Sequence, residues 1–293
     1  MKKILITGGT GYAGASLIAS FQKSYDIFAC YHNSNPLTKI LNKDKWIKLD
    51  LASSSNIKKI VKEIKPEVLI HTAAIATINV CDNNPKKAYR INVEGTKKLL
   101  EECAPNTKFI YLSTDLVFDG IRGNYSEKDI PSPKHYYGET KYFAEQEIQK
   151  IDKNWVILRC ALMYGTSPST HNTFFTNSIN KIKNGEAVTF FLDEYRTPLF
   201  LNDLSLAIEK IIKNDAKGIF HVGGREKLSR LEFAKIVAEV FSLNKSLIKS
   251  AKVADMPNPE KRARDCSLNI DKMRKELSWE PGDVRSNLKN ISF

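Results

Sequence analysis

The chain contains few cysteines and arranges none of them in pairs. An odd number of scattered thiols without a C-x-x-C motif fits neither a disulfide framework nor a zinc site, so we expect reduced, buried side chains. No two histidines stand at metal-ligand spacing, and no metal site is expected. The five cysteines are Cys30, Cys81, Cys103, Cys160 and Cys266.

Long apolar runs are also missing. No stretch approaches the roughly 20 apolar residues that a membrane-spanning helix needs. The apolar run that follows the two N-terminal lysines ends at Gly8, which is too short for the core of a signal peptide. We therefore expect a cytoplasmic protein without a membrane partner.

Acidic residues are outnumbered by basic ones: 33 Asp and Glu stand against 45 Lys and Arg, a net charge of +12. The lysines are spread over segments with helical spacing, such as 57–65 and 180–185, as on a solvated surface. No basic run is interleaved with aromatic residues, so no nucleic-acid partner is expected. A positive field would attract ligands that carry phosphates.

Short apolar runs alternate with segments of helical spacing through the first half of the chain. The alternation predicts an α/β fold of the Rossmann type, a doubly wound parallel sheet with helices on both faces. A hydrophobic content of 42% is sufficient for such a core. Strands are expected at 3–7, 26–31, 46–49, 68–71, 109–113 and 156–159, and helices at 13–23, 54–64, 87–103 and 137–150.

After residue 164 the regular alternation ends. We predict a first domain at 1–164 and a smaller α+β domain at 165–293, with 201–223 returning to the main sheet. In this part a polar loop at 166–176 precedes helices at 175–184, 201–213, 230–241 and 270–277 and strands at 187–192 and 218–223.

The first strand runs directly into a glycine-rich turn that opens a helix. Glycines at 8, 11 and 14 have the spacing G-x-x-G-x-x-G. One glycine allows the tight turn, one lets the backbone approach a pyrophosphate, and one lets helix and strand pack closely. The N–H groups at the helix start attract phosphates, so a ligand-free structural turn is the weaker interpretation. We predict a dinucleotide site at Gly8, Thr10, Gly11, Tyr12, Ala13 and Gly14.

The segment after the second strand, Cys30-Tyr31-His32-Asn33, contains no acid. An Asp or Glu there would bind both ribose hydroxyls of NAD. Its absence favours NADPH, while NADH stays open because no arginine is present for the 2′-phosphate. Asp50 and Leu51 follow the third strand and are placed to cover the adenine, although Asp50 also fits a helix-cap region. The residues expected around the adenosine half are Tyr31, His32, Asn33, Lys39, Asp50 and Leu51.

Tyr137 and Lys141 stand at i and i+4, on one face of a predicted helix. A phenol titrates near pH 10, and a neighbouring lysine cation lowers that pKa. Upstream, the strand at 109–113 leads into Thr114 at the carboxyl edge, where ligands bind in open α/β sheets. A hydroxyl there can donate to a carbonyl oxygen on which negative charge develops. Tyr137 is therefore the candidate general acid.

Together these motifs resemble the extended short-chain dehydrogenases/reductases, in the same order and over essentially the whole chain. The segment Ser113-Thr114-Asp115-x-Val117-Phe118 resembles the dTDP-4-dehydrorhamnose reductase branch in particular. That branch also includes the regulatory subunit of methionine adenosyltransferase. The matching segments are 7–14, 71–74, 92–93, 113–120, 137–141, 159–165, 196–204 and 264–268.

The resemblance implies an NAD(P)H-dependent reductase of a nucleotide-linked keto sugar, with hydride passing to a ketone carbon, commonly C4. The first domain would bind the cofactor and the second mainly the substrate; a homodimer is left open. In the family roles, Thr114 donates to the carbonyl, Tyr137 is the acid, and Lys141 holds the ribose and adjusts the pKa of the phenol. Ala73, Ala74 and Asn92 would line the cofactor, and Thr114, Asp115, Leu116, Leu162 and Arg196 the substrate.

Arg196 is the candidate for the substrate's phosphates, with Arg262 and Arg264 as weaker ones. For all three arginines a solvated surface position is an equal alternative. Among the histidines, His71 lies in an apolar strand and is expected in the core, whereas His135 and His171 are loop residues at the edge of the pocket.

Two departures from the family pattern bear on which substrate and which reaction are expected. Leu162 replaces an aromatic residue of the bacterial rhamnose enzymes, which counts against dTDP-4-dehydrorhamnose itself. Leu116 stands where the related 4,6-dehydratases carry the glutamate needed for elimination. Two alternatives remain: an epimerase that retains NAD, and a regulatory subunit that binds the cofactor without turnover. The intact Thr114, Tyr137 and Lys141 argue against the second.

Overall fold

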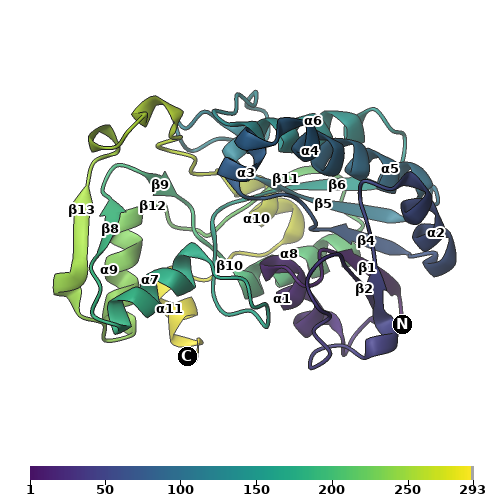
Figure 1. Cartoon of the computed structure of the whole chain (residues 1–293), viewed down its shortest axis with the longest axis horizontal. Coiled ribbons are helices and arrows are strands. Elements are labelled where there is room, and N and C mark those ends of the chain that lie inside the picture. Colours follow the sequence, from purple (N-terminus) through teal and green to yellow (C-terminus); the bar gives the residue numbers. More distant parts are fainter. Residues whose placement is uncertain (292–293) are drawn as a thin grey trace.

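The computed structural model describes residues 1–291, which form a seven-stranded parallel sheet between two helical layers and a smaller lobe beside it (Figure 1). The first strand lies near the middle of the sheet; the next two strands extend the sheet on one side of it, and the later strands extend it on the other side. This strand order confirms the predicted Rossmann fold. Such a reversal leaves a crevice at the carboxyl ends of the central strands. In spatial order the strands are β11 (Gly218–Val222), β6 (Trp155–Cys160), β5 (Lys108–Thr114), β4 (Val68–His71), β1 (Lys3–Thr7), β2 (Asp26–Tyr31) and β3 (Trp46–Lys48).

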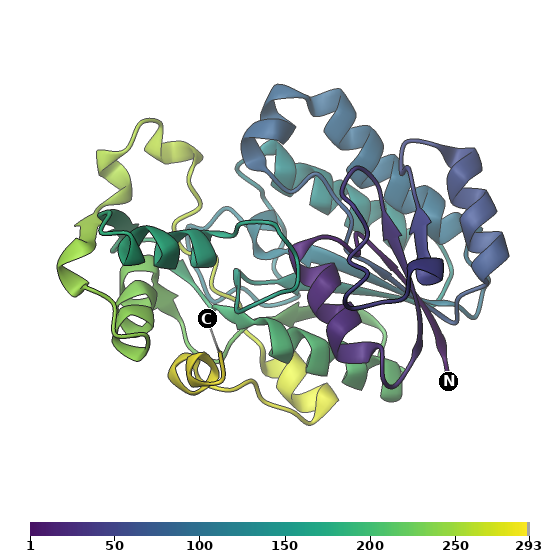
Figure 2. The ribbon, with the colours of Figure 1, turned by 60° about the horizontal axis from the view of Figure 1, so that its bottom comes forward.

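Helices cover both faces of the sheet (Figures 1 and 2). Because both faces are buried, every residue of β4 and β5 is buried, and the apolar residues in the middle of each strand are continuous rather than alternating. Each face has its own apolar core. One face carries α2 (Ser54–Ile64), α5 (Gly95–Glu102) and α6 (Tyr136–Gln149); the other carries α1 (Tyr12–Phe21), α8 (Leu201–Lys213) and α10 (Asp271–Leu277).

The helix predicted at 87–103 is interrupted. It consists of α4 (Pro85–Tyr89), a π-helical turn at Arg90–Glu94, and α5. A π-helical turn adds a residue to the helical repeat, and such turns are common at functional sites. A short helix, α3 (Ile78–Asn83), precedes α4 in a stretch where the sequence predicted none.

The second lobe is held together by short strand pairs and helices. Its core contains an aromatic cluster in which Tyr164 contacts Phe175, Phe200 and Phe233. The strand pairs are β7 (Met163–Tyr164) with β10 (Leu199–Phe200), β9 (Tyr195–Arg196) with β12 (Leu228–Ser229), and β8 (Val188–Phe191) with β13 (Ile248–Ala251). The helices are α7 (Phe174–Lys183), α9 (Arg230–Val240) and α11 (Val284–Lys289).

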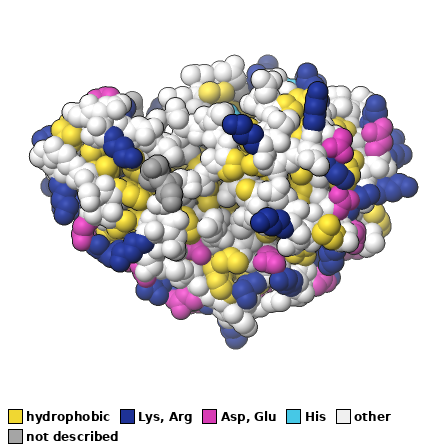
Figure 3. All heavy atoms as spheres, turned by 90° about the horizontal axis from the view of Figure 1, so that it is seen from below, with side chains coloured by type: hydrophobic (Ala, Val, Ile, Leu, Met, Phe, Trp, Pro, Cys, Tyr) yellow, Lys and Arg dark blue, Asp and Glu magenta, His cyan; other side chains and the backbone are white. Residues whose placement is uncertain are grey.

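The stretch 201–223 lies against the main sheet: α8 contacts α1, and β11 pairs with β6. The domain division at residue 164 stays a prediction. On the face seen in Figure 3, Lys and Arg side chains are scattered among acidic ones rather than gathered in one patch. No helix within residues 1–291 is long and apolar enough to cross a membrane. The five cysteines are buried and unpaired.

Candidate active site

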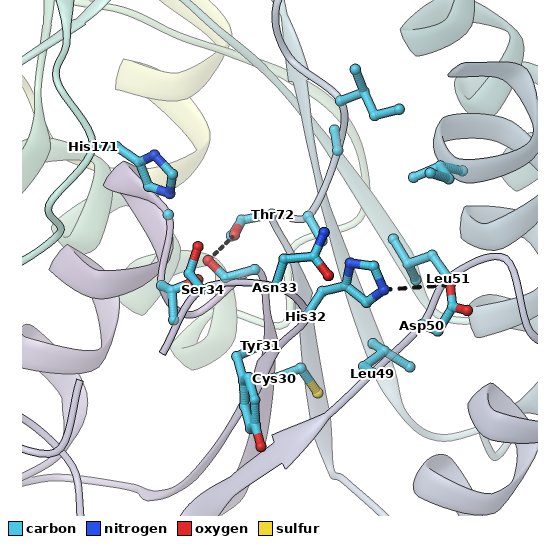
Figure 4. Close-up of a pocket in the computed structure, with 17 residues that line it drawn as sticks. Cys30, Tyr31, His32, Asn33, Ser34, Leu49, Asp50, Leu51, Thr72 and His171 are labelled. Atoms are coloured by element: carbon cyan, nitrogen blue, oxygen red, sulfur yellow. Dashed lines mark hydrogen bonds and ion pairs between the residues drawn. The ribbon is translucent and has the colours of Figure 1, made fainter. Parts of the chain in front are cut away.

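A first cavity lies at the carboxyl ends of β1, β2 and β4 (Figure 4). The glycine turn forms one wall, and its close contacts require glycine. Gly8 has a φ of +67°, and a Cβ at Gly14 would lie 2.2 Å from the Gly8 carbonyl oxygen. The cavity is lined by Gly8, Thr10, Gly11, Cys30, Tyr31, His32, Asn33, Ser34, Leu49, Asp50, Leu51, Thr72, Ala73, Ala74, Ile75, Ile91 and His171.

Most residues predicted around a dinucleotide therefore come together here, including both alanines at 73 and 74. Figure 4 shows His32 between the turn and Asp50, with its Nε2 3.9 Å from the carboxylate. Lys39 is not part of this lining. Tyr12 is not part of this lining either; its hydroxyl donates to the Gly165 carbonyl (2.8 Å).

Several lining residues were missed by the sequence analysis. Ser34, Leu49, Thr72 and Ile75 are chain neighbours of predicted residues, and that adjacency was the signal. His171 reaches the cavity from the loop after β7; the sequence placed it only at the edge of a pocket.

Asn92 was expected along the cofactor, but its side chain is only 1% exposed and is used within the protein. Its Oδ1 accepts from Ile75 N (2.8 Å), and its Nδ2 donates to Ile75 O (3.0 Å) and to the Thr140 hydroxyl (3.0 Å). Thr140 donates in turn to the Tyr137 carbonyl (2.8 Å). The expectation is thus corrected: both amide atoms already have partners, and Asn92 fixes the cavity wall against the helix that carries Tyr137.

A buried hydrogen-bond chain, which we call the His71 relay, continues this connection to the glycine turn. The Thr96 hydroxyl donates to Asn92 O (2.7 Å), so it accepts from His71 Nε2 (2.8 Å). His71 Nδ1 therefore accepts from the Thr7 hydroxyl (2.6 Å). Burial, and then the charge of Lys141, lower the pKa of His71 to about 3, so the ring is neutral. His71 lies in the core, as the sequence predicted.

A second cavity, of about 720 Å³, opens between the sheet edge and the second lobe. Its size falls in the roughly 300–1,000 Å³ range of small-molecule sites. Of the predicted substrate residues, four line it directly, and Thr114 adjoins them. The lining is Ile78, Asn79, Asp82, Asp115, Leu116, Lys134, His135, Tyr136, Glu139, Leu162, Glu194, Arg196, Arg230, Met256, Pro257, Asn258, Lys261, Arg262 and Ala263.

The side chains of Thr114 and Tyr137 lie close together beside this cavity. The Thr114 hydroxyl also accepts from Leu116 N and donates to the Asp115 carboxylate, both at 3.2 Å. Burial, and then the charge of Asp115, raise the pKa of Tyr137 above its usual value. The sequence predicted that Lys141 would lower this pKa, whereas in this structure burial raises it. The phenol keeps its proton, as a general acid must.

Lys141 lies deeper on the same helix, with Nζ 4.0 Å from the centre of the Tyr111 ring. Burial lowers its pKa to about 7, and the charge of Glu145 opposes the shift. Glu145 is itself held by Arg159 (2.8 Å) and Ser113 (2.5 Å). Among residues 1–291 no hydrogen-bond acceptor for its Nζ is found, and Lys141 is not part of the lining of either cavity.

Arg196 lines the second cavity but is 7% exposed, so a solvated surface position is wrong for this residue. Its guanidinium donates to Tyr195 O (2.6 Å) and Ala263 O (3.1 Å), and its Nε lies 3.4 Å from Asp115. Most of its donors are therefore used internally. Arg264 is exposed and does not line the cavity.

Two further arginines line the cavity. Arg262 is paired with Glu194 at 2.7 Å. Arg230, which the sequence analysis missed, stacks on the Phe174 ring (3.8 Å) and lies 3.9 Å from Glu194. A cation at the first residue of α9 is disfavoured by the helix dipole, and this was the available signal of a special role.

The order in which the strands are added around β1, with the Tyr-Lys helix beside the crevice, defines the class as an extended short-chain dehydrogenase/reductase. More specifically, the chain belongs to the family described as RmlD substrate binding domain, which matches residues 1–292. This is the dTDP-4-dehydrorhamnose reductase branch that the sequence motifs resemble.

Individual relatives have different activities. Methionine adenosyltransferase 2 subunit beta of Bos taurus is 28% identical over 278 residues, 91% of this chain and 81% of that protein. A probable low-salt glycan biosynthesis reductase of Haloferax volcanii is 25% identical and covers 97% of this chain and 95% of its own. The structure of dTDP-4-dehydrorhamnose reductase from Bacillus anthracis in complex with NADP has a TM-score of 0.86 at 25% identity, with 99% of both chains covered. The NADP in the Bacillus anthracis structure supports a nicotinamide cofactor.

Proposed function

We propose that this protein is an NADPH-dependent reductase of a nucleotide-linked keto sugar, reducing a ketone at C4 of the hexose. The observation that carries the proposal is the neighbouring pair of Thr114 and Tyr137, whose protonated phenol stands beside the second cavity and on the same helix as Lys141. An acid, a second hydroxyl donor and a buried cation are the groups that carbonyl reduction needs.

The first cavity fits a dinucleotide. Gly8 and Gly11 line it without side chains, so the backbone N–H groups at the start of α1 can reach the pyrophosphate. His32 and Asn33 would contact the 2′-phosphate, because no carboxylate stands at the end of β2 to repel it. Lys141 would hold the nicotinamide ribose. Bound NADPH supplies the hydride.

The chain's own residues carry the proton. Tyr137 donates its proton to the carbonyl oxygen of the substrate. Thr114 turns its hydroxyl from Asp115 to the same oxygen and stabilises the charge that develops there. The ammonium of Lys141 stabilises the phenolate that Tyr137 becomes, since an opposite charge favours the ionised form.

The second cavity offers groups for a sugar nucleotide. Leu116 and Leu162 present apolar surface near Thr114, and Arg230, Lys134 and Lys261 add positive charge for a diphosphate. Arg196 has few free donors, so its larger contribution is the positive charge it brings to this wall.

The test is an activity assay with a panel of dTDP-, UDP- and GDP-linked 4-keto sugars. Turnover is measured as the consumption of NADPH. We expect turnover with at least one of them, and NADPH bound at least as tightly as NADH in a fluorescence titration. No turnover with any sugar would contradict the proposal, and a strong NADH preference would contradict its cofactor part. The substitution His32→Asp should shift the cofactor preference towards NADH, because it adds a carboxylate after β2 that can bind the ribose hydroxyls.

A second candidate is a subunit without turnover, favoured by the methionine adenosyltransferase relatives. It predicts NADPH binding, no reduction of any sugar in the panel, and co-elution with a methionine adenosyltransferase catalytic subunit in size-exclusion chromatography. The reductase proposal predicts that at least one sugar in the panel is reduced and that the protein does not co-elute with that catalytic subunit.

A further inference from the structure

His135 has two positions at once: it is the N-cap of α6 and it lines the second cavity. Its Nδ1 accepts from the backbone N–H of Gly138 (3.1 Å), in the manner of the Ser, Thr, Asn and Asp side chains that usually cap helices. The cap precedes the residues that carry the acid, so the orientation of this ring is tied to the catalytic helix.

Capping determines where the ring proton lies. A neutral imidazole that accepts at Nδ1 carries its hydrogen on Nε2, which is then a donor. Burial lowers the pKa of His135; the Asp82 carboxylate opposes this shift and Arg196 adds to it, so the ring is neutral at physiological pH. Among residues 1–291 no acceptor for Nε2 is found. Nε2 is also absent from the fully buried polar atoms that lack a partner, so it is open to the cavity.

The donor also stands beside the reacting groups. The rings of His135 and Tyr137 are stacked, with centroids 6.2 Å apart and planes at 22°. Nδ1 faces the first turn of α6, and Nε2 occupies the opposite edge of the ring, in a side chain that lines the cavity with Leu116 and Leu162.

We propose that His135 is a specificity-determining residue that donates a hydrogen bond from Nε2 to a substrate oxygen next to the reacting carbonyl. In a 4-keto sugar nucleotide that oxygen is the hydroxyl on the adjacent ring carbon. The inference rests on the proposed function and extends it, because it selects keto sugars that carry this hydroxyl over deoxy analogues. One side chain thereby starts the catalytic helix and recognises the sugar.

The experiment separates the cap from the donor. His135→Ser keeps a capping oxygen but is too short to reach the substrate, whereas His135→Asn keeps both a capping oxygen and an N–H donor. With the keto-sugar nucleotide that is turned over in the panel, we expect His135→Ser to raise KM about three- to tenfold, the range for one hydrogen bond. The thermal midpoint and NADPH affinity should stay near wild type, and His135→Asn should recover part of the KM.

Asp283→Ala is the matched control, since it removes the cap of α11, where Asp283 accepts from Ser286 N (2.8 Å), outside both cavities. It should lower the thermal midpoint without changing KM. An active enzyme whose KM is unchanged by His135→Ser would overturn the inference and leave the proposed function standing. The inference would also be overturned if His135→Ser lowered the thermal midpoint and weakened the binding of NADPH and of the sugar nucleotide to the same degree. A wild-type protein that neither binds nor reduces any sugar in the panel would overturn the proposed function, and this inference with it.

Discussion

Two buried groups on one helix have pKa values displaced in opposite directions. Burial raises that of Tyr137 and lowers that of Lys141 to about 7, so an acid that keeps its proton stands one turn from a cation that is easily neutralised. Groups whose environments displace their pKa values in this way mark acid and base roles. The i, i+4 spacing was visible in the sequence, but the depth of burial that causes the shifts was not.

Tyr137→Phe removes the proton donor and little else. Turnover should fall by roughly two to four orders of magnitude, the scale of general acid catalysis. NADPH affinity should barely change, because the phenol does not hold the cofactor. Steady-state kinetics and fluorescence titration measure the two quantities, and a collapse of cofactor binding would instead identify Tyr137 as structural.

Lys141→Met should abolish turnover yet stabilise the fold. Lys141 keeps its ordinary pKa of 10.5 when unfolded but has one of about 7 when folded. Between these values the unfolded chain binds more protons, so the cost of burying the amine is largest below about pH 7 and declines as pH rises. Differential scanning fluorimetry should show the gain in thermal midpoint below pH 7 and a smaller gain towards pH 10. Equal midpoints at all pH values would contradict the assignment.

At the scale of elements, the His71 relay joins the glycine turn, β4, the π-helical turn and, through Asn92, the catalytic helix. Thr96→Val should leave His71 Nε2 and Asn92 O without their partner, at a cost of about 1–3 kcal/mol in unfolding free energy. NADPH affinity should fall as well, because the cavity wall around Ile75 loses its support. Chemical denaturation and fluorescence titration measure the two effects.

Thr107→Val is the control for that prediction. The Thr107 hydroxyl is equally buried and donates to Pro66 O (2.9 Å), but it precedes β5, at the opposite edge of the sheet from the cavities. The variant should lose stability and retain NADPH affinity. If both variants weakened NADPH to the same degree, the relay would have no particular role in the cofactor site.

The same elements show how far the sequence predicted the fold. The strands of the main sheet were found because each is a continuous apolar run, and Thr114, Tyr137 and Lys141 because their motifs are local. The π-helical turn was not predictable from helical spacing, since Asn92 and Thr96 owe their positions to contacts with β4 and α6. The burial of Arg196 was hidden for a similar reason: its acceptor Ala263 lies 67 residues further along the chain.

At the scale of the whole molecule, a net charge of +12 favours anionic ligands, and the lining of the second cavity contains five Lys and Arg residues beside four acidic ones. The KM of a nucleotide sugar should rise with ionic strength, because charges more than about 8–10 Å apart are screened at physiological salt. The measurement is KM across a salt series. A neutral ketone with the same reacting group should show no such dependence, and a salt-independent KM for the sugar nucleotide would count against recognition through its phosphates.

The late return of β11 has a consequence for how the protein is made. β6 is complete about 60 residues before its neighbour β11 has been synthesised, an interval of roughly 3–12 seconds at a ribosome's pace of about 5–20 residues per second. Throughout that time Val156, Ile157 and Leu158, all fully buried at the end, form an open strand edge that other chains can join. A chain that stops after residue 164 keeps this edge permanently, so the main sheet is complete only after synthesis has passed through β11.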